Sequence, residues 1–205
     1  MRIARYGLVL ALLTCGGILP GTIGGIPFPL HAGQAFAAQP HIGDVVDAID
    51  GVNAYYNGPI GNVTGRNTAK DGYNLGLRYQ CVEFVKRYYY EHYSHKMPDS
   101  YGHAKDFFDP KTGNGKINRS RNLIQYANGH GAKPHKGDLL VFDGTPFNSY
   151  GHVAIVASAS DTEIEMIQQN PGPQAPPRIR LSMQKSSNGG WQVDSDTLLG
   201  WLRKP

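Results

Sequence analysis

The order of two hydrophobic patterns constrains the fold of this 205-residue chain most strongly. Residues 81–95 (CVEFVKRYYYEHYSH) repeat apolar side chains at steps of three and four, which predicts an amphipathic helix that stops before Pro98. After Gly137 the pattern changes to short apolar runs separated by turn residues, which predict strands. These strands are expected at residues 138–142, 151–157, 163–169, 179–181 and 198–202. The second and third of them are close enough to form a hairpin.

The chain before this change is otherwise poor in regular patterns. Residues 51–76 are rich in Gly and Asn and predict a loop, as do residues 98–120. A short helix is expected within residues 38–50 (in DVVDAID) and another at residues 121–128. Helices then precede strands, and this order predicts an α+β fold in which N-terminal helices pack on one side of an antiparallel sheet.

The N-terminus has the pattern of a secretory signal peptide. Arg2 and Arg5 form a basic start, residues 6–13 (YGLVLALL) form an apolar run, and residues 35–37 (AFA) offer a cleavage site after Ala37. The apolar run is shorter than the roughly 20 residues that a membrane-spanning helix needs. We therefore expect residues 1–37 to be removed, leaving one domain at residues 38–205 that is periplasmic or secreted, without stable membrane insertion.

Two further expectations concern location and partners. The alternative role of Cys15, which follows LLT after the apolar run, is lipidation, although Thr14 is a poor residue before such a cysteine. With 20 Lys and Arg against 16 Asp and Glu, the charge is only mildly positive and gives no sign of nucleic-acid binding. The chain shows no repeats and is expected to be a monomer.

Cleavage after Ala37 would leave Cys81 as the single cysteine of an exported protein. Cysteines in oxidising compartments normally pair, so an unpaired one suggests a chemical role as an alternative to a buried apolar one. Cys81 begins the predicted helix, where free backbone N–H groups and the helix dipole favour a thiolate and lower its pKa. The same N–H groups can hold an oxyanion. These features favour Cys81 as a nucleophile.

A nucleophilic cysteine needs a base, and His152 is the best placed histidine. It stands at the start of a strand of small and branched apolar residues, where its ring can face the start of a neighbouring helix. Taken alone, it fits an ordinary half-buried histidine equally well. His92 and His95 share a helix face, but no third ligand with suitable spacing accompanies them. We therefore expect no metal and no cofactor.

The base needs a group that orients its ring, and Gln168, Gln169 and Asn170 lie on the partner strand. A three-residue hairpin loop centred on Ser160 would place Gln168 opposite His152. A two-residue turn would place Gln169 there instead. A slip of one residue reverses every side chain, so the spacing leaves these alternatives open.

The residues around these positions resemble the CHAP family, the cysteine- and histidine-dependent amidohydrolases and peptidases. The likeness lies in residues 80–84 (QCVEF) with Lys86 and Arg87, residues 137–142 (GDLLVF) and residues 151–156 (GHVAIV), in this order, and continues through Gln169-Asn170 to Gly200-Trp201. Among members of the family, the chain most resembles the amidase domain of glutathionylspermidine synthetase/amidase enzymes. The resemblance implies a papain-like fold.

The resemblance also implies roles for individual residues. Cys81 would be the nucleophile, His152 the general base and Gln168 the third residue, where the family usually has a glutamate. A glutamine can accept the ring N–H but cannot neutralise an imidazolium, although papain-like sites use an amide there. Gln80 would add an oxyanion-hole or substrate contact, and Asn170 either contacts substrate or orients His152 in place of Gln168.

The implied reaction is cleavage of an amide bond through a thioester, with peptidoglycan peptide as the expected substrate. Two alternatives remain: a substrate of the glutathionylspermidine or γ-glutamyl amide type, and an inactive CHAP domain that binds wall peptide or a partner protein.

Overall fold

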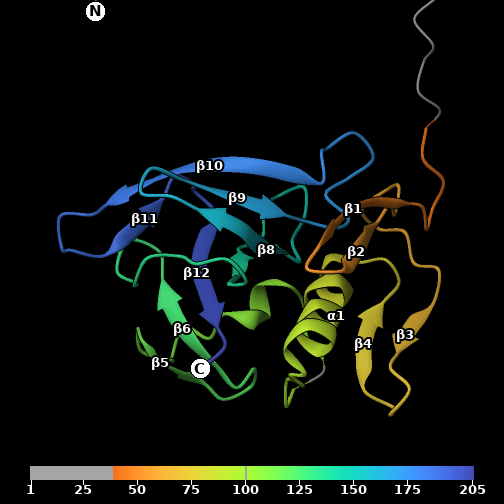
Figure 1. The fold of residues 1–205 in the computed structure, drawn as a ribbon, viewed down its shortest axis with the longest axis horizontal. Coiled ribbons are helices and arrows are strands. Elements are labelled where there is room, and N and C mark those ends of the chain that lie inside the picture. The colour runs from red at the N-terminus through yellow and green to blue at the C-terminus, as the bar shows by residue number, and fades with distance from the viewer. Residues whose placement is uncertain (1–38, 100) are drawn as a thin grey trace, which may run out of the picture. The chain divides into compact units, whose positions relative to one another are not determined.

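A computed structural model describes residues 39–99 and 101–205, and it consists mostly of strands (Figure 1). The predicted signal peptide, its cleavage site and Cys15 lie outside the described residues. Within the described residues there is one α-helix, α1 (Cys81–Tyr93), and one short 3-10 helix, η1 (Lys105–Phe107). The strands are β1 (Val45–Ile49), β2 (Val52–Tyr55), β3 (Arg66–Thr68), β4 (Asn74–Leu77), β5 (Lys116–Asn118), β6 (Leu123–Ala127), β7 (Leu139–Phe142), β8 (His152–Ala159), β9 (Glu163–Ile167), β10 (Arg178–Lys185), β11 (Trp191–Val193) and β12 (Leu198–Arg203).

The predicted helix at residues 81–95 and the five predicted strands are all present, but the prediction of several N-terminal helices is wrong. Within residues 121–128, burial alternates along β6 with the two-residue period of a strand. Residues 45–49 form β1, which pairs with β2 through the two-residue turn Asp50-Gly51. Both turn residues have positive φ, as a tight hairpin turn requires. This Asp-Gly turn makes a hairpin where a helix was expected.

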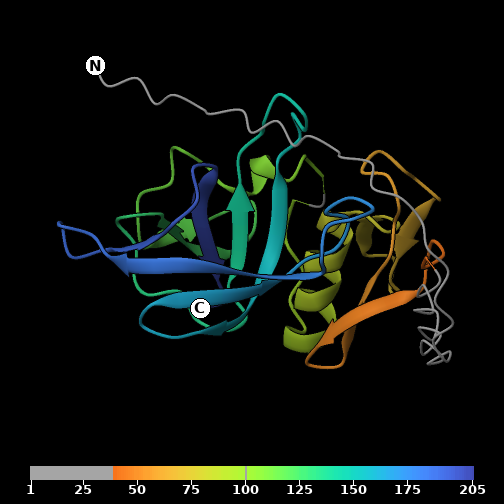
Figure 2. The ribbon, with the colours of Figure 1, turned by 90° about the horizontal axis from the view of Figure 1, so that it is seen from above.

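Eight of the strands form one antiparallel sheet in the order β11-β10-β9-β8-β7-β12-β6-β5. The sheet curls, because β11 at one end meets the segment that follows β6. There Asn128 exchanges two hydrogen bonds with the backbone of Val193, at 2.9 and 3.1 Å. Two small hairpins, β1–β2 and β3–β4, complete the fold. Figures 1 and 2 show α1 between the large sheet and the β3–β4 hairpin.

The central strands β7 and β8 are buried on both faces, which explains their continuous apolar sequences. One face packs against α1, whose Tyr88 and Tyr89 are fully buried. The Tyr89 hydroxyl lies 3.0 Å from the Gly137 carbonyl and 3.1 Å from that of Leu202, and so joins the helix to the sheet. The other face packs around Trp201 inside the curled sheet. This packing sets the start of α1 beside the start of β8.

Candidate active site

Cys81 is the first residue of α1, and the helix start has no side-chain cap. Its thiol is buried and unpaired, and the backbone N–H groups of Val153, Val82 and Cys81 favour its charged form. Val153 follows His152 on β8 and shares a core cluster with Cys81, so the sulfur lies beside the strand that carries the imidazole. The uncapped N–H groups also leave donors at the place where an oxyanion would form.

Burial raises the pKa of the Cys81 thiol to about 11, although the three backbone N–H groups act in the opposite direction. The helix start alone predicts a lowered pKa for this thiol. The loss of hydration around a buried thiolate outweighs that effect here. The thiol is therefore protonated in the free protein at neutral pH.

The ring of His152 is held by Gln168 in one defined tautomer. Nε2 of His152 lies 2.9 Å from Oε1 of Gln168, and Nε2 of Gln168 donates to the Pro176 carbonyl at 3.0 Å. A carbonyl can only accept, so the bond to Pro176 fixes the amide with its oxygen toward the ring. His152 must then carry its proton on Nε2, which leaves Nδ1 free as a base.

Burial lowers the pKa of His152 to about 4, and the hydrogen bond from its ring to Gln168 raises it by less. A glutamine has no charge with which to stabilise an imidazolium. Together with the protonated thiol, this gives an uncharged pair at neutral pH.

The pairing of β8 with β9 differs from both hairpin registers that the sequence allowed, and Gln168 is not directly opposite His152. Strands β8 and β9 pair Ile155 with Ile167 and Val156 with Met166, and the register shifts at a bulge beyond Val156. Continuing this register would place Gln168 opposite residue 154. The long glutamine side chain instead spans the diagonal to His152, a reach that neighbouring strands allow.

Asn170 and Gln80 hold the loop at one side of the site, since the amide groups of both donate to this loop and that of Asn170 also donates to Gln80. Nδ2 of Asn170 donates to the Ile60 carbonyl at 2.9 Å and to Oε1 of Gln80 at 2.7 Å. Nε2 of Gln80 donates to the carbonyls of Ile60 and Asn62 at 3.0 and 2.8 Å. Both amide hydrogens of Gln80 are thus in use, and it could serve an oxyanion only after one of these bonds opens.

Gln169 belongs to a buried network that sequence reasoning missed. Its Nε2 donates to the Gln80 carbonyl at 3.0 Å and to Oε2 of Glu83 at 2.8 Å, and its Oε1 accepts from the Tyr55 N–H at 2.8 Å. Glu83 also pairs with Arg87 at 2.7 Å, with both side chains buried. The network joins the end of β9 to the first turn of α1, and so fixes the position of Gln168 relative to Cys81. In the sequence, only Glu83, two residues after Cys81, hinted at such a network.

Cys81 and His152 line one pocket of about 650 Å³, together with Gln80 and Asn170. The other described residues that line it are Ile60, Gly61, Val63, Arg66, Gly76, Leu77, Val82, Tyr101, Gly102, His103, Ala104, Asn148, Tyr150 and Gly151. Most of these lie in loops, where the sequence has no periodicity to indicate that they gather. The pocket is large enough for several residues of a peptide.

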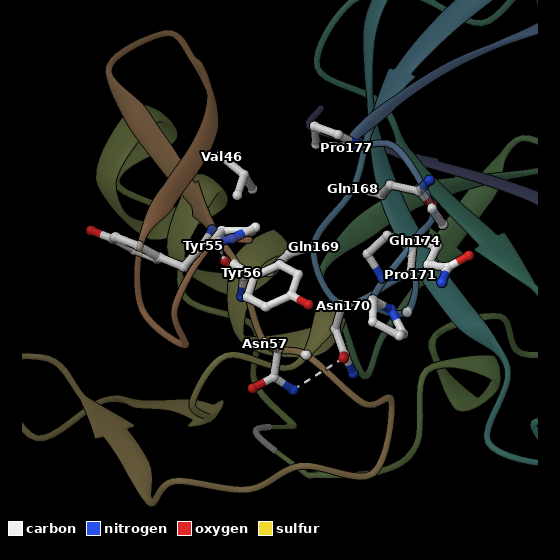
Figure 3. A pocket seen from close by; sticks show the side chains of 15 residues that line it. Val46, Tyr55, Tyr56, Asn57, Gln168, Gln169, Asn170, Pro171, Gln174 and Pro177 are labelled. Atoms are coloured by element: carbon white, nitrogen blue, oxygen red, sulfur yellow. Dashed lines mark hydrogen bonds between the residues drawn. The ribbon is translucent and has the colours of Figure 1, made fainter. Parts of the chain in front are cut away.

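Gln168 lines a second, smaller pocket of about 150 Å³ with Gln169 and Asn170. Tyr55, Tyr56 and Asn57 line the same pocket, and Figure 3 shows Asn57 bonded to Asn170. The proline-rich loop at residues 171–177 contributes to the same pocket. The small pocket thus lies behind the residue that orients His152.

Among the described residues, no group of three or more His, Cys, Asp or Glu side chains is arranged to hold a metal ion. His92 stacks on Tyr88, with ring centroids 5.1 Å apart, and Nε2 of His95 lies 2.9 Å from the Arg121 carbonyl. None of the described helices is long and apolar enough to cross a membrane.

A thiol, a neutral imidazole and an orienting amide that share one frame are the parts of a nucleophilic site for amide chemistry. Comparison with known families agrees with this class. Residues 70–170 match the CHAP domain, a range that includes all three groups, and the chain therefore contains a CHAP domain.

Curated relatives are similar over a larger part of this chain. The bifunctional glutathionylspermidine synthetase/amidase of Escherichia coli (strain K12) is 30% identical over 138 residues, 62% of this chain and 22% of that protein. The trypanothione synthetase of Crithidia fasciculata is 25% identical over 164 residues, 75% of this chain and 25% of that protein. This chain thus spans about a quarter or less of these relatives. The CHAP domain and the amidase relative support an amidohydrolase or peptidase function.

Proposed function

We propose that the protein is a cysteine amidohydrolase or peptidase in which Cys81 is the nucleophile and His152 the general base. One observation carries the proposal: the thiol at an uncapped helix start and the histidine fixed by Gln168 line the same pocket. Because the pair is uncharged at neutral pH, Nδ1 of His152 takes the thiol proton as the sulfur attacks.

The reaction follows from these positions. The Cys81 sulfur bonds to the amide carbonyl carbon, and the oxyanion that forms accepts hydrogen bonds from N–H groups at the start of α1. The imidazolium then gives its proton to the leaving nitrogen, the C–N bond breaks and a thioester remains. Water attacks the thioester while His152 takes its proton, the C–S bond breaks to release the carboxylic acid, and the imidazolium returns its proton to the Cys81 thiolate.

Gln168 limits how long the imidazolium persists. Its carbonyl oxygen accepts a hydrogen bond from the Nε2–H group of His152 in both protonation states, so the ring keeps its orientation throughout. It supplies no negative charge, so the imidazolium is a short-lived state between two proton transfers. Burial also disfavours the charged form of the Cys81 thiol, so both groups are neutral before the reaction.

The proposed substrate is the peptide of the bacterial cell wall, reached after export. The basic start, apolar run and AFA cleavage site of residues 1–37 support export, and a lone cysteine fits an exported hydrolase. The second candidate substrate is an amide of the glutathionylspermidine type. The amidase in the name of the Escherichia coli relative favours it.

A digest of purified sacculus tests the assignment. Wild-type protein is expected to release new muropeptides, detected by mass spectrometry, while the Cys81→Ala protein leaves them unchanged. If the wild-type protein hydrolyses glutathionylspermidine and leaves the muropeptides intact, the glutathionylspermidine type of amide is the substrate and wall peptide is not. Retention of labelled wall peptide without cleavage, equal in both proteins, would identify an inactive binding domain.

A further inference from the structure

The pocket around Cys81 has an uneven charge. Of the described residues that line it, Arg66 alone carries a permanent charge, and none is an aspartate or glutamate. Arg66 lies on β3, opposite Leu77 of β4, which also lines the pocket. A ligand that enters this pocket meets one fixed positive charge and no carboxylate.

The guanidinium of Arg66 is held in place but not neutralised. It donates to Oδ1 of Asn74 at 2.9 Å, and no carboxylate of the described part of the chain lies within ion-pair distance of it. Arg87, Arg178 and Arg203, by contrast, each meet a carboxylate at 2.6 to 2.7 Å. Arg66 is an exposed residue that lines the pocket, and the donors of its guanidinium match a planar carboxylate.

The rim of the same pocket is apolar and aromatic. Ile60, Val63, Tyr101 and Tyr150 line it, and each is more than two-fifths exposed. The ring of His103, another lining residue, lies against Tyr150 with centroids 4.8 Å apart. Exposed apolar side chains around a hollow are typical of a surface that binds an extended ligand. The ligand thus has an apolar or backbone-like body and an anionic group.

We infer that Arg66 is a substrate-binding residue that anchors a carboxylate of the substrate peptide and selects against cationic amides. The inference rests on the proposed function, because it concerns the same pocket. A peptide joined through the γ-carboxyl of glutamate keeps its α-carboxylate free near the linkage, which suits this anchor. A polyamine tail finds no negative partner among the described lining residues.

Two peptides that differ in one group test the anchor. L-Ala-γ-D-Glu-L-Lys carries the free α-carboxylate on its glutamate, and the D-isoglutamine version carries a primary amide there. Wild-type protein should cleave the carboxylate peptide with a kcat/KM about tenfold higher or more, the difference that one charge-assisted bidentate contact gives. Arg66→Gln should remove this preference and still cleave the amide peptide. Arg66→Lys should keep part of it.

Arg119→Gln is the matched control, because Arg119 is exposed and does not line the pocket. It should leave both kcat/KM values unchanged. An equal loss on both peptides in Arg66→Gln, or an unchanged preference, overturns the inference.

Binding separates this inference from the proposed reaction. Both peptides are titrated into Cys81→Ala and into Cys81→Ala with Arg66→Gln, where no cleavage occurs. Tighter binding of the carboxylate peptide that disappears with Arg66→Gln supports the anchor even if the wild-type protein cleaves neither peptide, which would refute the proposed function alone. Equal affinity for the two peptides, or no binding of the carboxylate peptide at millimolar concentration, overturns the anchor whatever the wild type cleaves.

Discussion

At the scale of single residues, Gln168 decides which nitrogen of His152 can act as a base. Its amide is oriented by the Pro176 carbonyl, so the ring proton lies on Nε2 and the lone pair on Nδ1. Burial lowers the pKa of His152 to about 4, and the hydrogen bond to the neutral amide raises it too little to offset this. A glutamate in this position could accept the same hydrogen bond from the His152 ring, but it would add a negative charge beside it.

Gln168→Glu is therefore expected to shift the pH dependence of activity. The carboxylate would stabilise the imidazolium and raise the pKa of His152 by about one unit or more. Activity needs the neutral ring, so the acidic limb of kcat/KM should move to higher pH by the same amount.

Gln174→Glu is the control, since it makes the same change at an exposed site of the adjoining loop. The acidic limb should not move in this variant. An unmoved limb in Gln168→Glu, or an equal shift in both, would contradict the assigned role of Gln168.

The three residues were not equally accessible to sequence reasoning. The position of Cys81 followed from a helical pattern that begins at this cysteine. His152 and Gln168 needed the CHAP motif, because hairpin symmetry alone gave the wrong register and a bulge past Val156 has no sequence signal. Arg66 was missed altogether, since it lies in a Gly- and Asn-rich segment that predicts only a loop.

At the scale of elements, the turn before β8 places His152. Gly151 has φ of +75°, and an added Cβ would lie 2.4 Å from the Phe142 carbonyl oxygen and 2.9 Å from Cβ of Lys105. The turn is thus closed against β7 and η1 with no room for a side chain.

Gly151→Ala should lower both stability and activity. Left-handed backbone costs an alanine about 1–2 kcal/mol, and the clash with Phe142 adds about 1–3 kcal/mol in the free energy of unfolding. Gly189→Ala is the control, because Gly189 has φ of +84° and open space around it. Urea unfolding of both variants measures the difference, and a loss in Gly151→Ala no larger than in Gly189→Ala would disprove the steric argument.

Elements were predicted best where burial gives them a strong period. The helix at Cys81 has such a period, and the doubly buried strands β7 and β8 were recognised instead by their continuous apolar runs. The N-terminal helices were wrongly predicted because residues 45–49 and 123–127 mix apolar and polar side chains over only five positions each. There the Asp50-Gly51 turn was the more reliable signal, and it indicates a hairpin.

At the scale of the whole molecule, the active-site histidine costs stability in acid. Its pKa falls from 6.5 in the unfolded chain to about 4 in the folded protein. Between these values the unfolded chain binds a proton that the folded protein does not, so stability decreases as the pH falls through this window. The full effect is about 3 kcal/mol at most, and it is absent above the unfolded pKa.

His152→Gln should remove this part of the pH dependence. Urea unfolding at pH 7 and pH 4.5 gives the loss of stability in each protein, and the loss should be smaller in the variant by up to about 2–3 kcal/mol. The six other described histidines are present in both proteins, so any contribution from them cancels in the comparison. Equal losses would show that His152 is not buried in its neutral form.

The central claim is that Cys81 forms a covalent acyl intermediate with an amide substrate. Mass spectrometry of the intact protein, quenched in acid during turnover of a wall peptide that it cleaves, tests this most directly. The account predicts an added acyl mass that maps to the peptide containing Cys81, disappears with hydroxylamine and is absent in Cys81→Ala. Turnover by wild-type protein that continues in Cys81→Ala, or an acyl group on any other residue, would contradict it.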